Sequence, residues 1–273
     1  MSSLLFFPLA VTPPSRLAIL LDTPPVSPTD HKSSWSPTHH SPNFSLSQCG
    51  TVAQRAPAEQ STDGVRGAEG QQGGLHVWEV NWDPAERGSH AVLGVSTQHC
   101  SLQASGYTVL VGGDAESWGW ELGSNQLWHG GIPCGQYPRR GTEQGEEFLE
   151  QQRPLAVPSR VLMVLDGDAG TLGFVVDGCF LGVAMQNLPL GVHLFPAVSS
   201  VWGGCRITLR YLNGGPSMSS MQKGELRDMI SCIMMAKLYT SPWVPQELRG
   251  CPQQVWVGEG GGKMEKTYTT VLN

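Results

Sequence analysis

From Gly74 onward, apolar and polar residues alternate in short runs, the period that places successive side chains on opposite faces of a β-strand. Residues 75–82 show this alternation most clearly. Further runs are predicted as strands at 91–96, 107–111, 161–166, 171–177 and 206–211. Because no helical pattern separates these runs, their connections are predicted to be antiparallel. The sequence therefore indicates an all-β, two-sheet sandwich.

Turn residues support this interpretation. Asp166-Gly167 and Asp177-Gly178 each follow a predicted strand, and Asp-Gly supplies the positive φ angles that tight hairpins need. Residues 129–158 are rich in Gly, Pro and Gln, so we expect a long exposed loop there.

The two ends of the chain differ from the strand-rich centre. Residues 1–50 are rich in Pro, Ser, Thr and His and read as an extended leader, which cannot order a central strand alone. Residues 17–21 are the exception, where a short docked helix is expected. Residues 224–238 predict one amphipathic helix, with apolar residues at helical spacing: Leu226, Met229, Ile230, Ile233, Met234 and Leu238.

Composition narrows the function classes. The 273 residues include 34 Gly and 20 Pro, only 15% are charged, and the net charge of -6 offers no cationic footprint for nucleic acid. Seven cysteines without a C-x-x-C pair argue against a disulfide framework and a thiolate zinc site, so a reducing, cytoplasmic location is expected. No apolar run approaches the roughly 20 residues that span a bilayer, so no membrane association is predicted.

Catalytic motifs were not found in the sequence. Gly262-Lys263 lacks the flanking residues of a phosphate-binding loop, and neither a G-x-S-x-G elbow nor an H-E-x-x-H helix is present. The pair His39-His40 reads as solvated, and Asp166, Asp168 and Asp177 are accounted for by turns. We therefore expect a protein that is not an enzyme and needs no cofactor or metal.

The tryptophans divide into two groups. Trp78 and Trp82 lie four residues apart and Trp118 and Trp120 lie two apart, so each pair faces one side of a sheet and is expected in the core. Trp202 lies instead between Val201 and Gly203 at a strand end or loop, where glycine permits the close approach of a partner. For Trp202, a binding role and a core role both remain open.

Five separated blocks, at 60–67, 74–78, 87–95, 116–123 and 196–203, resemble the SPRY domain-containing SOCS box proteins in the same order. The resemblance runs from about residue 16 to residue 214. It implies a SPRY domain over 51–214, after the leader, and a divergent SOCS-box-like tail over 215–273 that contains the short helical segment.

The resemblance implies a bent antiparallel sandwich that binds a short peptide on client proteins: an acidic residue, an aliphatic residue and then an asparagine run. The SOCS box of that family recruits elongin B, elongin C and a cullin, so the protein would select clients for ubiquitination and proteasomal degradation. The peptide pocket carries over onto Arg55, Pro57, Gln60, Ser61, Tyr107, Leu110, Val201, Trp202 and Gly203.

The expected roles follow from side-chain chemistry. Arg55 would pair with the acidic residue of the peptide, and Gln60 and Ser61 would bond its asparagines. Tyr107 and Trp202 would form rigid apolar walls. Glu59 stands where the family usually has alanine, and a carboxylate there should repel an acidic peptide.

The tail departs further from the family pattern. An elongin-binding box needs a leucine four residues before its cysteine, but Cys232 is preceded there by Asp228, although Ala236 fits the position after it. The family's Leu-Pro-Leu-Pro sequence is also absent. Three alternatives follow: a ubiquitin-ligase adaptor, a stand-alone peptide-binding module or decoy, and an enzyme with an unrecognised site.

Overall fold

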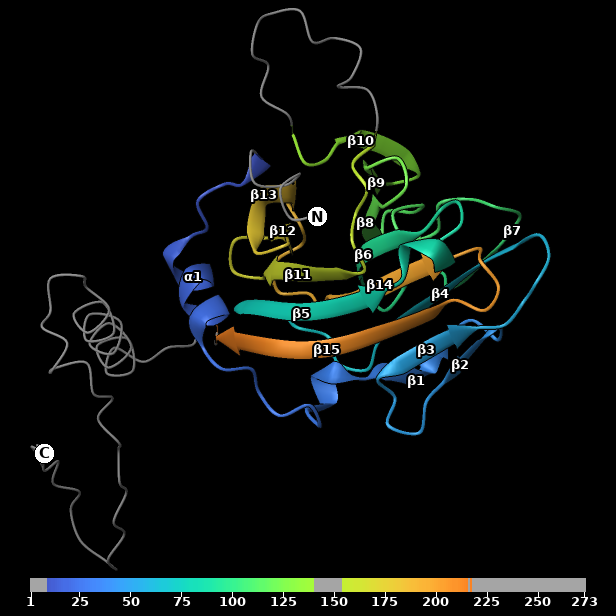
Figure 1. Ribbon diagram of the computed structural model, residues 1–273, viewed down its shortest axis with the longest axis horizontal. Helices are drawn as coiled ribbons and strands as arrows, with labels where there is room; N and C mark the ends of the chain where they lie inside the picture. Colours follow the sequence, from blue (N-terminus) through green and yellow to red (C-terminus); the bar gives the residue numbers. More distant parts are fainter. Residues whose placement is uncertain (1–8, 140–153, 216, 218–273) are drawn as a thin grey trace, which may run out of the picture. The chain divides into compact units, whose positions relative to one another are not determined.

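A computed structural model describes residues 9–139, 154–215 and 217, all within the compact unit Met1–Ser220. These residues form two antiparallel β-sheets (Figure 1). The first sheet has the order β1 (Trp35–His40), β4 (Ser61–Gly67), β14 (Phe195–Ser200), β6 (Val92–Ser96), β8 (Ser117–Glu121), β9 (Gln126–His129) and β10 (Ile132–Gln136), with β7 (Gln103–Ser105) on β4. The second has the order β13 (Cys179–Gln186), β12 (Thr171–Val176), β11 (Arg160–Asp166), β5 (Leu75–Trp82), β15 (Arg206–Gly215), β3 (Val52–Arg55) and β2 (Phe44–Leu46).

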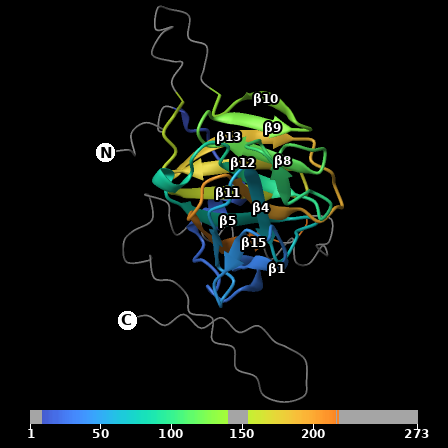
Figure 2. The same cartoon turned by 90° about the vertical axis from the view of Figure 1, so that its right-hand side faces the viewer.

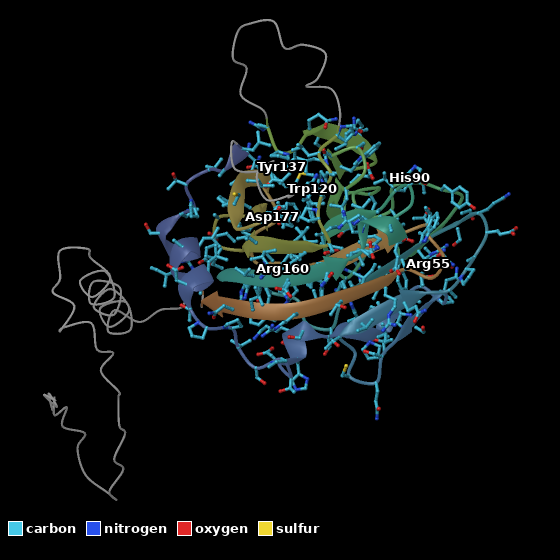
Figure 3. The ribbon with its side chains drawn as sticks, in the orientation of Figure 1. Arg55, His90, Trp120, Tyr137, Arg160 and Asp177 are labelled. Atoms are coloured by element: carbon cyan, nitrogen blue, oxygen red, sulfur yellow. The ribbon has the colours of Figure 1, made fainter. Side chains whose placement is uncertain are left out.

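The two sheets enclose one main core. Trp78 and Trp82 from β5 and Trp118 and Trp120 from β8 are buried in the same apolar cluster, as their even spacing along each strand predicts. The ring of Trp120 lies 5.2 Å from that of Tyr137, centroid to centroid, and the two side chains are labelled in Figure 3. The prediction of an all-β sandwich is therefore confirmed.

Most predicted strands are confirmed, and the Asp177-Gly178 hairpin is the clearest turn. Both residues have positive φ, 49° and 79°, and they join β12 directly to β13. The strand predicted at 107–111 is wrong: Thr108 donates its amide to the Thr62 hydroxyl at 3.0 Å instead of to a neighbouring strand. The predicted loop at 129–158 contains β10, which pairs with β9, and its residues 140–153 lie outside the described residues.

The leader contributes more ordered structure than its composition suggests. The short helix is confirmed as α1 (Ser15–Asp22), and Leu17 packs with Leu75, Val164 and Phe180 of the second sheet. Single-turn 3-10 helices follow at His31–Ser33 and Pro84–Glu86. The strands β1 and β2 are also in the leader, each at the end of its sheet, and Figure 2 shows β1 and β10 at opposite ends of the fold.

The segment predicted as an amphipathic helix, 224–238, lies outside the described residues. Within the described part of the chain, the five cysteines are all unpaired thiols, and no helix is long and apolar enough to cross a membrane. No cluster of metal-binding side chains occurs among these residues either.

Candidate functional site

Strand pairing brings three distant stretches of the chain to one end of the sandwich. β4 pairs with β7 from Ser61 to Asp63, and β14 pairs with β4 on its other side. β15, which follows β14 through a short loop, pairs with β3. Residues 55–61, 103–110 and 201–205 therefore meet at the end opposite α1, and we call them the three-loop surface (Figure 1).

Direct contacts join the three loops. A Cβ placed on Gly203 would lie 2.7 Å from the Cα of Pro57, so glycine is needed for these two loops to touch. Next to this contact, the Gly204 amide donates to the Arg55 carbonyl at 2.7 Å. The Gly106 amide donates to the Gln60 carbonyl at 2.6 Å. The loops therefore form one continuous surface.

Two large aromatic side chains are exposed on this surface. Tyr107 is 55% exposed and Trp202 is 48% exposed. The Trp202 ring lies against Gly88, where an added Cβ would be 2.8 Å from Cε3, so the ring is supported although about half of the side chain is exposed. Such supported, exposed aromatics are typical anchors of binding surfaces.

The other predicted site residues fall into two groups. Pro57, Gln60 and Gly203 are exposed, and Ser61 and Val201 are half-buried, so these five can reach a ligand. Leu110 is buried beneath the surface, where its Cδ2 would be 3.3 Å from a Cβ on Gly64. Leu110 therefore supports the surface from below and does not line it as predicted.

Arg55 differs most from its expected role. Its side chain is fully buried, and its Nε and Nη2 contact the Asp63 carboxylate at 2.8 and 2.7 Å (Arg55 is labelled in Figure 3). The predicted partner of Arg55 was an acidic residue of a peptide, but in this structure Asp63 already occupies the guanidinium.

Sequence reasoning missed Asp63. It lies on β4, two residues after Ser61, at a fully buried position. Burial raises the pKa of this carboxyl, whereas hydrogen bonds from Ser41, Asn43 and Arg55 and the charge of Arg55 lower it, and the lowering prevails. An aspartate inside an otherwise buried strand was the available signal, since buried carboxylates need partners.

Carboxylates border the surface. Glu59 is exposed next to Gln60, and the Glu86 carboxylate accepts the Arg206 amide at 2.9 Å beside the third loop. The border of the three-loop surface therefore carries negative charge, as Glu59 in the sequence indicates.

The described residues also contain a cavity of about 210 Å³ next to α1, on the other side of the fold. This volume is below the roughly 300 Å³ at which ligand pockets usually begin. Its walls include Pro14, Arg16, Leu17, Val164, Phe180 and Val183. None of the predicted site residues lines it.

Comparison with known proteins decides the family. Residues 75–211 match the SPRY domain. A stretch of 205 residues is 46% identical to SPRY domain-containing SOCS box protein 1 of Homo sapiens, covering 74% of this chain and 72% of that protein.

The chain belongs to the SPRY domain-containing SOCS box protein family. Two further members are similar over comparable lengths. SPRY domain-containing SOCS box protein 2 of Homo sapiens is 43% identical over 202 residues, 73% of each chain. Protein gustavus of Drosophila melanogaster is 42% identical over 205 residues, 74% of this chain and 70% of its own.

The SPRY match covers only part of the three-loop surface. Tyr107 and the loop at 201–205 lie inside residues 75–211, whereas residues 55–61 precede them. The first loop of the surface thus connects β3 to β4, and both strands lie before the matched SPRY residues in the sequence.

Proposed function

We propose that this SPRY protein is a non-enzymatic adaptor that captures a short peptide segment of client proteins on its three-loop surface. The observation that carries the proposal is the pair of exposed aromatics, Tyr107 and Trp202, on loops that contact the turn at 57–60. Rigid aromatic side chains supply much of the binding energy at protein interfaces while losing little conformational entropy.

The proposed ligand is an extended acidic peptide with a run of asparagines. Gln60 and Ser61 offer amide and hydroxyl groups that can exchange hydrogen bonds with asparagine side chains. Tyr107 and Trp202 offer apolar contact for the aliphatic residue. Because Arg55 is held by Asp63, recognition rests on hydrogen bonds and apolar contact more than on an ion pair.

We further propose that the tail at 215–273 recruits elongin B, elongin C and a cullin. The protein would then act in the cytoplasm as the client receptor of a ubiquitin ligase and lead its clients to the proteasome. Membership in a family named for its SOCS box supports this step. The Asp228 position in the sequence favours the alternative, a peptide-binding decoy that lacks ligase recruitment.

Two measurements on the full chain separate these functions. Titration calorimetry with a blocked Asp-Val-Asn-Asn-Asn peptide tests client binding, and a pull-down with purified elongin B and elongin C tests recruitment. Binding in both assays supports the ligase adaptor. Peptide binding without elongin capture supports the decoy, and absence of peptide binding contradicts both.

A further inference from the structure

The Asp63 carboxylate collects donors from four separate segments of the chain. Its Oδ2 accepts from Arg55 of β3. Its Oδ1 accepts from Ser61 on its own strand at 3.1 Å, and from further side chains of the β1–β2 turn and of β7: Ser41, Asn43 and Gln103. Asp63, Arg55 and Ser41 are buried, so the centre of this cluster lies beneath the three-loop surface, whereas Ser61 and Gln103 extend to that surface.

Arg55 connects this hydrogen-bonded cluster to the loop at 56–61. Its Nη2 donates to the Ser61 carbonyl at 2.9 Å and to the Ala58 carbonyl at 3.3 Å, and its Nη1 donates to the Ala56 carbonyl at 3.4 Å. One guanidinium therefore binds three backbone carbonyls of the loop that carries Pro57 and Gln60. A loop fixed in this way needs little ordering when a ligand binds.

We propose that Asp63 is a positioning residue of the three-loop surface: through Arg55 it fixes the loop at 56–61, and it cancels the charge of Arg55. The fixing of the loop concerns the free protein alone, and the effect of the cancelled charge on binding rests on the proposed function. The consequence is that Arg55 gives the site little preference for an acidic over a neutral peptide.

The need to balance the buried charge of Arg55 explains why Asp63 both fixes the loop and cancels the charge. A buried guanidinium without a counter-charge is costly, so removing Asp63 leaves Arg55 to find another anion. A ligand carboxylate bound at the surface above it could supply that anion. Loss of the Asp63 charge should therefore loosen the loop and, at the same time, make the site favour acidic peptides.

Hydrogen exchange on the free protein tests the positioning role without any ligand. Ser41→Ala removes one donor to Asp63, and Ser33→Ala is a matched control, because Ser33 is a leader serine with the same burial whose hydroxyl accepts the Tyr211 amide at 2.9 Å. We expect Ser41→Ala to speed exchange roughly tenfold in 58–61 and 103–108, and Ser33→Ala to speed exchange only near Tyr211. Unchanged exchange in those two loops would overturn the proposal.

Peptide selectivity tests the charge role. Affinities of wild type and Asp63→Asn are measured for Asp-Val-Asn-Asn-Asn and for its neutral form Asn-Val-Asn-Asn-Asn. We expect the ratio of the acidic to the neutral affinity to rise roughly tenfold in Asp63→Asn. A purely structural role would weaken both peptides by the same factor and leave the ratio unchanged, which would refute the charge role. If wild type binds neither peptide, the proposed function and the charge role both fail, and the exchange experiment still decides the positioning role.

Discussion

The amide of Gln60 donates a hydrogen bond to the phenolic oxygen of Tyr107 at 3.3 Å, across 47 positions of sequence. Gln60 has a positive φ of 50°, in the left-handed region that non-glycine residues seldom adopt. This bond ties the first loop to an exposed aromatic of the second. It shows that the surface is built by tertiary contacts and not by a single motif.

Trp202 is the first residue to test by substitution. We expect Trp202→Ala to weaken peptide binding by about 2 kcal/mol, roughly 30-fold in Kd, because the supported ring is lost. Leu190→Ala is the matched control, since Leu190 is 64% exposed but lies outside the three loops. Titration calorimetry with equal affinity for wild type and Trp202→Ala would remove Trp202 from the binding surface.

Glu59 is expected to oppose an acidic ligand. Glu59→Ala should tighten binding of the acidic peptide, more strongly at low salt than at high salt, because salt screens the repulsion that the substitution removes. Glu69→Ala is the control, since Glu69 is also exposed but follows the far end of β4. If both variants bind equally well at low ionic strength, Glu59 does not face the ligand.

Asp63 gives the stability of the protein a defined pH dependence. Its pKa in the folded state lies below the ordinary value of 3.8, so its contribution is fully present above that pH and is lost as the pH falls through the folded value. We expect urea unfolding to show a steeper loss of stability below about pH 4 in wild type than in Asp63→Asn. Parallel curves for the two proteins would mean that the carboxylate gains nothing from folding.

Cys49 is expected to be the most reactive described thiol. Hydrogen bonds from Ser47 and Thr51 lower the pKa of this exposed thiol to about 7, whereas burial raises the pKa of Cys100 to about 12. Iodoacetamide at neutral pH should therefore modify Cys49 and spare Cys100 in the native protein, as read by mass spectrometry. Thr51→Val should slow the reaction at Cys49, and an unchanged rate would show that the Thr51 hydroxyl does not activate the thiol.

Much of the fold could be predicted from period-two patterning. The Trp78 and Trp82 pair and the Trp118 and Trp120 pair mark the inner faces of the two sheets, and Asp177-Gly178 marks a hairpin. The strands β1 and β2 escaped prediction because Pro, Ser and His dominate their neighbourhood. The buried Trp35 and Phe44 and the partly buried Leu46 attach these strands to the core, and three side chains are too few to give a periodic signal.

The candidate site was less accessible to sequence reasoning. The family resemblance placed Arg55 in the peptide pocket, but Asp63, eight residues later on β4 of the other sheet, binds its guanidinium. Tyr107 lies in an irregular loop, where the amide of the next residue, Thr108, donates to the Thr62 hydroxyl and not to a neighbouring strand. Both features depend on which distant segments lie side by side in the fold, and apolar patterning along the sequence does not specify those neighbours.

The central claim is that three distant loops form one peptide-binding surface. Titration of the isotope-labelled chain with Asp-Val-Asn-Asn-Asn, followed by amide and indole NMR signals, tests it most directly. The account predicts that the largest shift changes fall in 58–61, 103–108 and 201–205, with the Trp202 indole among them. Changes concentrated at the α1 cavity, or confined to one of the three loops, would contradict it.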